Sequence, residues 1–317
     1  MIAIDTTVDL SVNVGGLRLK NPVMPASGTF AEELTHLLDF NLLGALVTKT
    51  ITTEKRTGNP MPRVCELSDG MMNAIGIPSK GADLFIDKAV PFYRNFESPL
   101  IVSISAPTIQ GFANLAARLS SVPGVAGIEA NISCPNLEAH GQSFGMQAGS
   151  TYKVVSMIRQ VTSLPLWVKL TPNAGEVAPI ALAAEEAGAD AVVVGNTLLG
   201  LSIDIERGRA RLGNFMGGIS GAAIRPLMVR LTYQCAKALE IPVIGCGGIS
   251  TADDALEFIY AGASAVQVGT ATFLHPKIMN TMIGELEAFC QRKGIRSVRS
   301  LIGALDDSPA MPFGALP

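Results

Sequence analysis

The chain has 317 residues, of which 48% are hydrophobic and 16% are charged, and its formal net charge is −3. This composition supplies enough apolar side chains for a large core. The slightly acidic balance, with lysines and arginines scattered along the chain, excludes the basic surface through which proteins bind nucleic acids or acidic membranes.

No apolar stretch approaches the ~20 residues that span a bilayer, and the N-terminal MIAIDTTVDLSV lacks the basic start and apolar run of a signal peptide. The five cysteines are widely spread, with no CxxC pair and no cysteine–histidine cluster. A disulfide framework and a zinc site are therefore not expected. The pattern favours a cytoplasmic protein with reduced thiols, no bound metal and no membrane or nucleic-acid partner.

The first predicted element is a β-hairpin over Asp9–Lys20, where apolar and polar residues alternate around Gly15-Gly16. Such a hairpin could plug the N-terminal end of a barrel. Short, mostly apolar runs bounded by Gly, Pro or Asn follow it, as expected for parallel strands buried on both faces. They are Pro22–Gly28, Ala45–Thr50, Leu100–Ala106, Gly127–Ser133, Leu166–Thr171, Asp190–Asn196, Pro242–Gly248 and Ser264–Ala271.

Helical spacing lies between these runs. Val177–Ala187 has one apolar stripe and stops at Gly188, and Ala252–Ala261 carries two aspartates in its first turn, where the helix dipole favours negative charge. Eight strand–helix alternations predict a (β/α)₈ TIM barrel, with the whole chain, 1–317, as a single domain. The alternative, a doubly wound sheet, usually has a GxGxxG motif after its first strand, and this motif is missing.

Three predicted strand-to-helix connections are long, at about 51–81, 134–149 and 197–220. Long connections in a compact domain are usually functional. In a barrel, all strand-to-helix connections open onto the catalytic face, so we expect the site there.

Glycines end the last two predicted strands, at Gly247-Gly248 and at Gly269-Thr270. Glycine lets backbone N–H groups approach an anion, and barrels of this type commonly bind phosphate after strands seven and eight. Gly221, before the preceding helix, is a third candidate. The pattern predicts a phosphate-bearing ligand without saying which one.

Two lysines end apolar strands, Lys49 in VTKT and Lys169 in WVKLTPN. A buried lysine is costly unless it is paired, so each is expected to face an anionic or electron-rich ligand. A structural salt bridge, a Schiff-base lysine, and a flavin with a carboxylate substrate all remain open.

Cys134 opens a long loop in the segment EANISCPN, between polar residues and before a proline. A thiol there could act as a base near neutral pH, and a buried structural thiol is the alternative. Amides gather on the same face, where each offers both a donor and an acceptor to a cyclic imide or amide, although Asn also favours turns. These amides are Asn73, Asn131, Asn136 and Asn196.

With these residues the chain resembles the dihydroorotate dehydrogenase family from about Val8 to Leu305. The motifs are RTGNPMPR, GMMNAIGIPSKG, EANISCPN, GQSFG, VKLTPN, GGISGAAIRP, IGCGGIS and VQVGTATF. A cysteine in the base position is similar to class 1 enzymes, whereas membrane-associated class 2 enzymes use serine. The NAIG segment and GGISGAAIRP look most like class 1B, whose barrel commonly pairs with an FAD and iron–sulfur subunit that passes electrons to NAD⁺.

The resemblance implies oxidation of (S)-dihydroorotate to orotate in pyrimidine biosynthesis, by a homodimer or by a complex with that subunit. FMN would be held by Ser27, Lys49, Thr50, Ser103, Asn131, Lys169, Gly195, Gly221, Gly247, Gly248, Gly269 and Thr270. Dihydroorotate would be held by Lys49, Asn73, Ala74, Ile75, Gly76, Ile77, Asn131, Asn196 and Thr197. Cys134 would take a proton from C5 while hydride leaves C6 for the flavin, and Lys169 would stabilise the charge of reduced FMN.

The chain departs from the branch at Ser103, where Asn is common, at Gly195, where a larger apolar residue is common, and at Ile77, where Leu is usual.

Three other functions stay open. An FMN-dependent dihydropyrimidine dehydrogenase would share the flavin and the cysteine but tends to have His at the position of Asn136. A phosphate-binding lyase would use a lysine imine, and an interaction subunit would leave these side chains idle. NAD⁺, fumarate and oxygen all remain candidate electron acceptors.

Overall fold

The computed structural model describes residues 7–133 and 143–308, and its centre is an eight-stranded parallel sheet. The strand order is β3-β16-β15-β10-β9-β8-β7-β4. The backbone N–H of Gly44, just before β4, donates to the carbonyl of Val23 in β3 over 2.8 Å, which links the two edges. The strands are β3 (Val23–Pro25), β4 (Leu46–Val47), β7 (Leu100–Ile104), β8 (Val125–Asn131), β9 (Leu166–Lys169), β10 (Ala191–Val194), β15 (Val243–Cys246) and β16 (Ala263–Val268). All eight predicted strands are confirmed, and the sheet forms a (β/α)₈ barrel.

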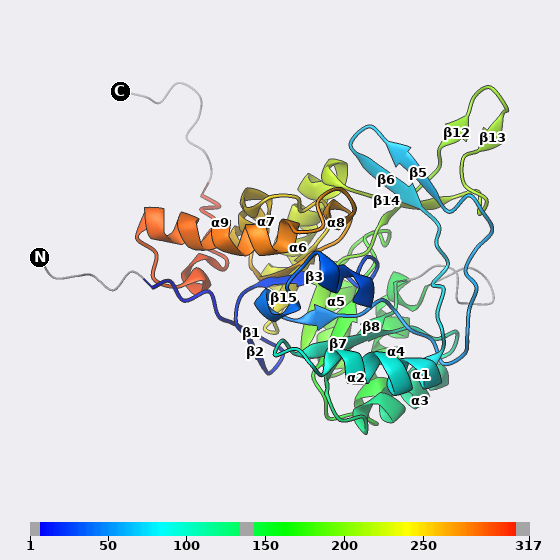
Figure 1. Ribbon diagram of the computed structural model, residues 1–317, viewed down its shortest axis with the longest axis horizontal. Coiled ribbons are helices and arrows are strands. Elements are labelled where there is room, and N and C mark those ends of the chain that lie inside the picture. Colours follow the sequence, from blue (N-terminus) through cyan, green and yellow to red (C-terminus); the bar gives the residue numbers. More distant parts are fainter. Residues whose placement is uncertain (1–6, 134–142, 309–317) are drawn as a thin grey trace, which may run out of the picture.

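Helices surround this sheet (Figure 1). They are α1 (Ala82–Leu84), a π-helical stretch (Phe85–Ala89), α2 (Val90–Tyr93), α3 (Ile109–Ser120), α4 (Ala148–Arg159), α5 (Ala178–Glu186), α6 (Arg225–Ala238), α7 (Ala252–Tyr260), α8 (Ala271–Leu274) and α9 (Ile278–Lys293). The predicted helices α5 and α7 are confirmed, and Thr251 caps α7 in a capping box with Asp254. Between β3 and β4 two short 3-10 helices, Glu32–His36 and Phe40–Leu42, replace the expected α-helix.

The predicted N-terminal hairpin is confirmed as β1 (Val12–Val14) and β2 (Leu17–Leu19). Its turn lies against the N-terminal ends of β9 and β10, because a Cβ on Gly15 would come within 2.9 Å of Trp167 Nε1 and 3.0 Å of Asp190 Cβ. Gly15 has φ 54°, a conformation that glycine adopts without strain. The hairpin therefore covers the end of the barrel opposite the strand C-termini.

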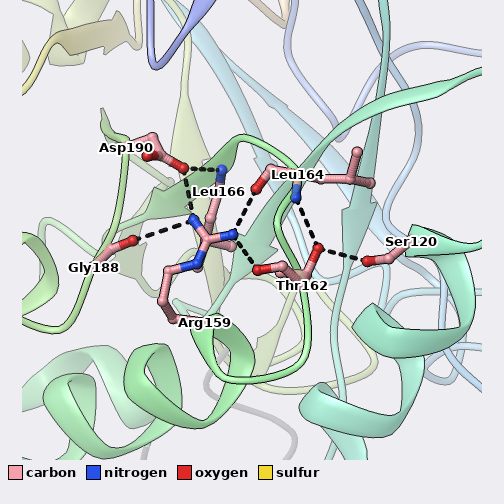
Figure 2. Close-up of polar contacts among 7 residues, drawn as sticks. All are labelled: Ser120, Arg159, Thr162, Leu164, Leu166, Gly188 and Asp190. Atoms are coloured by element: carbon pink, nitrogen blue, oxygen red, sulfur yellow. Dashed lines mark hydrogen bonds and ion pairs between the residues drawn. The ribbon is translucent and has the colours of Figure 1, made fainter.

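Beside this hairpin, Arg159 at the end of α4 ties together the segments that lead into β9 and β10 (Figure 2). Its guanidinium donates to Asp190 Oδ2 over 2.8 Å, to the carbonyl of Leu164 over 2.9 Å and to the carbonyl of Thr162. The same Asp190 oxygen accepts the backbone N–H of Leu166 over 2.8 Å. These contacts fix where two neighbouring strands begin.

The long connections 51–81 and 197–220 contain strands that the sequence did not predict. They form a four-stranded antiparallel sheet in the order β11-β14-β6-β5, from β5 (Val64–Leu67), β6 (Gly70–Asn73), β11 (Leu198–Gly200) and β14 (Gly217–Ser220). Next to it, β12 (Ile203–Asp204) and β13 (Arg209–Ala210) make an arm that projects from the barrel (Figure 1). Two connections that are far apart in sequence thus form one layer beside the strand ends.

Within the described ranges, none of the helices combines the length and the hydropathy that crossing a bilayer requires.

Candidate active site

The predicted site residues in the described part of the chain lie in or just after barrel strands, or in the connections that follow them. Because all strands of a parallel barrel point the same way, their C-terminal ends meet at one face. Side-chain hydrogen bonds join many of these residues into one buried set.

One half of this set connects three of the predicted substrate and flavin residues. Asn196 Nδ2 donates to Ser133 Oγ over 2.7 Å, and Ser133 Oγ donates to Asn131 Oδ1 over 2.6 Å. Asn131 Nδ2 then donates to Thr50 Oγ1 over 3.2 Å. The ends of β10, β8 and β4 are thereby held together by polar side chains.

The other half leads from Ser103 to Lys169. The hydroxyls of Thr50 and Ser103 lie 2.9 Å apart, and Ser103 Oγ donates to Glu129 Oε1 over 2.9 Å. Gln267 Nε2 donates to Glu129 Oε2 over 2.6 Å, and Lys169 Nζ donates to Gln267 Oε1 over 2.8 Å. Lys169 is therefore held inside the barrel by an amide, and it forms no direct ion pair with another residue that the structure describes.

Sequence reasoning missed Glu129 and Gln267, which are both fully buried. The signal was available, because each is a polar residue inside an otherwise apolar strand, the feature that singled out Lys169. It also gave no role to Cys246, whose Sγ lies 3.8 Å from Lys169 Nζ.

Lys49 follows β4 and is half-buried, and no hydrogen bond or ion pair connects it to another described residue. Burial lowers the pKa of its ammonium group below the usual value. A desolvated cation in this state gains free energy when an anion binds, so Lys49 is suited to hold a carboxylate.

Glycines form tight backbone approaches where the predicted phosphate site lies. Gly248 has φ 79°, and a Cβ there would come within 2.8 Å of the backbone nitrogen of Arg225 at the start of α6. Gly247 has φ 126°, and its Cβ would come within 2.7 Å of a side-chain carbon of Met228. Gly221, with φ 108°, would come within 2.5 Å of the Cα of Gly70. These three positions require glycine because a side chain would collide with the chain's own atoms, and their positive φ values favour glycine as well.

The other predicted phosphate and flavin residues are less constrained. A Cβ on Gly269 would meet nothing closer than 3.5 Å, so this position has room for a side chain. Thr270 Oγ1 donates to Ser220 Oγ over 2.8 Å, which ties the end of β16 to β14. Gly195 follows β10, and a Cβ there would lie 3.0 Å from the carbonyl oxygen of Leu170. Ser27 is buried just after β3.

The predicted substrate segment Asn73–Ile77 begins in β6 and is positioned by β14. Asn73 pairs with Gly218 in the antiparallel register, and Asn73 Nδ2 donates to its carbonyl over 3.4 Å. Thr197 lies against the same glycine, since a Cβ on Gly218 would come within 1.9 Å of Thr197 Oγ1. Asn73 and Thr197 therefore converge on β14. The segment continues from the buried Ala74 through Ile75 to Gly76 and Ile77. The last two residues have left-handed backbone conformations, with φ values of 77° and 49°.

Cys134 and Asn136 lie outside the described residues. The chain enters that segment from Ser133, which is buried and hydrogen-bonded to both Asn131 and Asn196. The remaining cysteines are buried free thiols: Cys65, Cys235, Cys246 and Cys290. Burial raises the pKa of Cys235 to about 12 and also raises the pKa values of Cys246 and Cys290, so these three thiols are poor bases near neutral pH.

Among the residues that the structure describes, no group of three or more His, Cys, Asp or Glu is placed to hold a metal ion.

Comparison with known proteins identifies the family of the chain. The family described as "Dihydroorotate dehydrogenase" matches residues 9–290. The chain is 47% identical over 299 residues to the dihydroorotate dehydrogenase B (NAD(+)) catalytic subunit of Geotalea uraniireducens (strain Rf4), covering 94% of this chain and 98% of that one. It is 48% identical over 299 residues to the subunit of the same name from Desulforudis audaxviator (strain MP104C), covering 94% and 97%.

A crystal structure of DHODH in complex with ferulenol from Eimeria tenella has the same fold, with a TM-score of 0.79 at 24% identity, covering 95% of this chain and 90% of that one. The structural match shows the fold, whereas the sequence matches show the family, because they extend over nearly the full length of the relatives. The chain belongs to the dihydroorotate dehydrogenase family, on its class 1B branch.

Proposed function

We propose that this chain, as a single FMN-binding barrel over residues 1–317, oxidises (S)-dihydroorotate to orotate. The observation that carries the proposal is the continuous set of side-chain hydrogen bonds from Asn196 to Lys169. It joins amides suited to a pyrimidine with a lysine suited to a flavin. The family membership supplies the reaction that both halves serve.

The described residues fit FMN, the cofactor of this family. Backbone approaches at Gly221, Gly247 and Gly248 leave no space for a Cβ, which suits the phosphate. The ammonium of Lys169 lies inside the barrel and is anchored on one side by Gln267. The other proposed contacts are Ser27, Lys49, Thr50, Ser103, Asn131, Gly195, Gly269 and Thr270. When bound, FMN supplies the acceptor for the hydride that leaves C6 of the substrate.

Dihydroorotate would be oriented by charge and by amides. Lys49 would bind the carboxylate. Burial removes part of the hydration of the Lys49 ammonium, and the ion pair with the carboxylate would compensate for that loss. Asn131 and Asn196 are fixed by Ser133 and would present donors and acceptors to the ring. Asn73 and Thr197, brought together by β14, would close the other side with the segment up to Ile77.

Cys134 would be the base that takes a proton from C5. Its place directly after Ser133 supports this role, because Ser133 lies between the two ring-binding amides. The raised pKa values of three of the buried cysteines support it as well. A thiolate at Cys134 would need to lie on the substrate face away from the flavin.

The test is anaerobic reduction of the FMN-loaded protein. Dihydroorotate should bleach the flavin, and dihydrouracil should not. A Cys134→Ser variant should bind FMN and bleach roughly 10²–10⁴-fold more slowly at neutral pH, the usual contribution of a general base. Cys290→Ala, which removes a buried thiol from α9, is the matched control and should bleach at the wild-type rate. A wild-type flavin that dihydroorotate leaves oxidised would refute the function, and unchanged bleaching of Cys134→Ser would refute the base assignment.

We further propose that the chain works in the cytoplasm with an electron-transfer subunit that carries FAD and an iron–sulfur cluster, and that two copies of the barrel associate. The relatives are named as catalytic subunits of NAD(+) enzymes, which supports a partner subunit. Large apolar side chains exposed on and beside the β12–β13 arm support association, among them Ile205, which is 85% exposed. Sedimentation of the purified chain alone would measure whether it dimerises.

A further inference from the structure

Glu129 is a buried carboxyl group for which the proposed reaction has no use. It lies in β8, is fully buried, and has no direct ion pair with a cation among the described residues. Each of its oxygens accepts one hydrogen bond from a neutral group, Ser103 Oγ at 2.9 Å and Gln267 Nε2 at 2.6 Å. Burying a carboxylate away from water is costly, so its presence here calls for a function.

The bonds around Gln267 allow only one orientation of its amide. Lys169 is only a donor, and a carboxylate is only an acceptor. The Gln267 carbonyl must therefore face Lys169 and its NH₂ must face Glu129, as the distances of 2.8 Å and 2.6 Å show. Without the carboxylate, the Gln267 NH₂ group loses its acceptor, and only the bond from Lys169 still holds the amide in this orientation.

We propose that Glu129 is a positioning residue that acts through Gln267 to hold the Lys169 ammonium and to balance its charge beside the flavin. This inference rests on the proposed function, in which Lys169 contacts FMN. Ser103, a departure from the common residue of the branch, donates to the same carboxylate and links it to Thr50. In this chain, the Thr50–Ser103 contact joins the half of the site that contains Asn131 and Asn196 to the half that contains Glu129 and Lys169.

The charge of Glu129 sets a direction for the flavin potential. Reduction adds negative charge to a flavin, so a fixed negative charge nearby opposes reduction and a positive charge favours it. In a water-excluded interior such charges act more strongly than in water. Removing the Glu129 charge leaves Lys169 uncompensated, and the midpoint potential of bound FMN should rise.

The first experiment measures this potential by equilibration with a redox dye in wild type, Glu129→Gln, Glu129→Asp and Ser105→Ala. Glu129→Gln keeps the shape, and its new amide can donate to Ser103. It should raise the two-electron reduction equilibrium constant at least tenfold, about 30 mV. Glu129→Asp keeps the charge and should change the constant less than threefold. Ser105→Ala removes the 3.2 Å bond from Ser105 Oγ to the Asn131 carbonyl, which lies off the path to Lys169, and should leave the potential at the wild-type value.

The second experiment titrates apo-protein with FMN and follows flavin fluorescence in Gln267→Leu, which replaces the amide by an apolar side chain of similar volume. Loss of the acceptor for Lys169 should weaken FMN binding at least tenfold. Equal potentials in Glu129→Gln and wild type would overturn the proposal. If Glu129→Gln holds no FMN, an unchanged dissociation constant in Gln267→Leu would overturn it instead. Wild-type protein that binds FMN without oxidising dihydroorotate would refute the proposed function and leave this comparison of potentials valid.

Discussion

Arg159 provides a quantitative prediction about the end of the barrel away from the site. Arg159→Met keeps the aliphatic part of the side chain and removes the donors to Asp190, Leu164 and Thr162 shown in Figure 2. The side chains of Arg159 and Asp190 are 26% and 39% exposed, so water can replace part of what is lost. Taking the lower end of the range for charged hydrogen bonds, we expect a loss of about 2 kcal/mol in the free energy of unfolding.

An unfolding entropy of roughly 2.1 cal/mol/K per residue converts this loss into a fall of about 3 °C in Tm for a chain of 317 residues. The measurement is thermal unfolding at saturating FMN, together with dihydroorotate turnover at a temperature well below Tm, which should be unchanged. Arg207→Met is the matched control, because it removes an exposed ion pair with Asp204 and should not shift Tm measurably. A Tm of Arg159→Met equal to wild type would show that water satisfies these carbonyls fully and would refute the reasoning.

The remaining predictions concern the ligands. Burial lowers the pKa of Lys49, so its cationic form is lost as pH rises through that lowered value, and the KM for dihydroorotate should rise over the same range. Because the unfolded chain binds this proton more tightly than the folded one, Lys49 destabilises the ligand-free protein below its folded pKa, and this cost disappears as pH rises. Lys49→Met should therefore raise the KM and also raise the Tm of the ligand-free protein at neutral pH, and a fall in that Tm would contradict the assignment. Gly248→Ala should weaken FMN binding at least tenfold, because its Cβ would come within 2.8 Å of the Arg225 nitrogen at a φ of 79°. Gly284→Ala on α9, where a Cβ meets open space, should bind FMN as wild type does, and equal FMN affinity in both variants would exclude a steric need for glycine at position 248.

The barrel strands were predictable because each is buried on both faces and therefore reads as a short apolar run. Ala191–Val194, four buried residues in a row, is the plainest case. The sheet β11-β14-β6-β5 was not predictable by the same means. Its strands are short, partly exposed and rich in glycine, and β6 pairs with β14 across most of the barrel sequence. Neither the hydrophobic periodicity of these strands nor a local turn signal predicts that β6 pairs with β14.

The site was predictable where chemistry leaves a local trace, as with a lysine in an apolar strand or a glycine pair at a strand end. The partners of these residues were not, because hydrogen bonds such as those from Gln267 to Glu129 and Lys169 join separate strands. Strand order alone says which chain segments are neighbours; it does not say which way an amide points. The position of Cys134 stays a prediction from the sequence.

The closing contacts of the barrel have a consequence for its synthesis. In the barrel sheet β3 pairs with β16, and Asp9 forms a parallel bridge with Ser297, so the first and last parts of the fold complete each other. A nascent chain leaving the ribosome exposes the unpaired edge of β3 until β16 has emerged. Folding during synthesis can therefore form the intermediate strands but cannot close the barrel before β16 is available. Until then, the unpaired edge of β3 must be protected from other chains, by chaperones or by rapid completion of the fold.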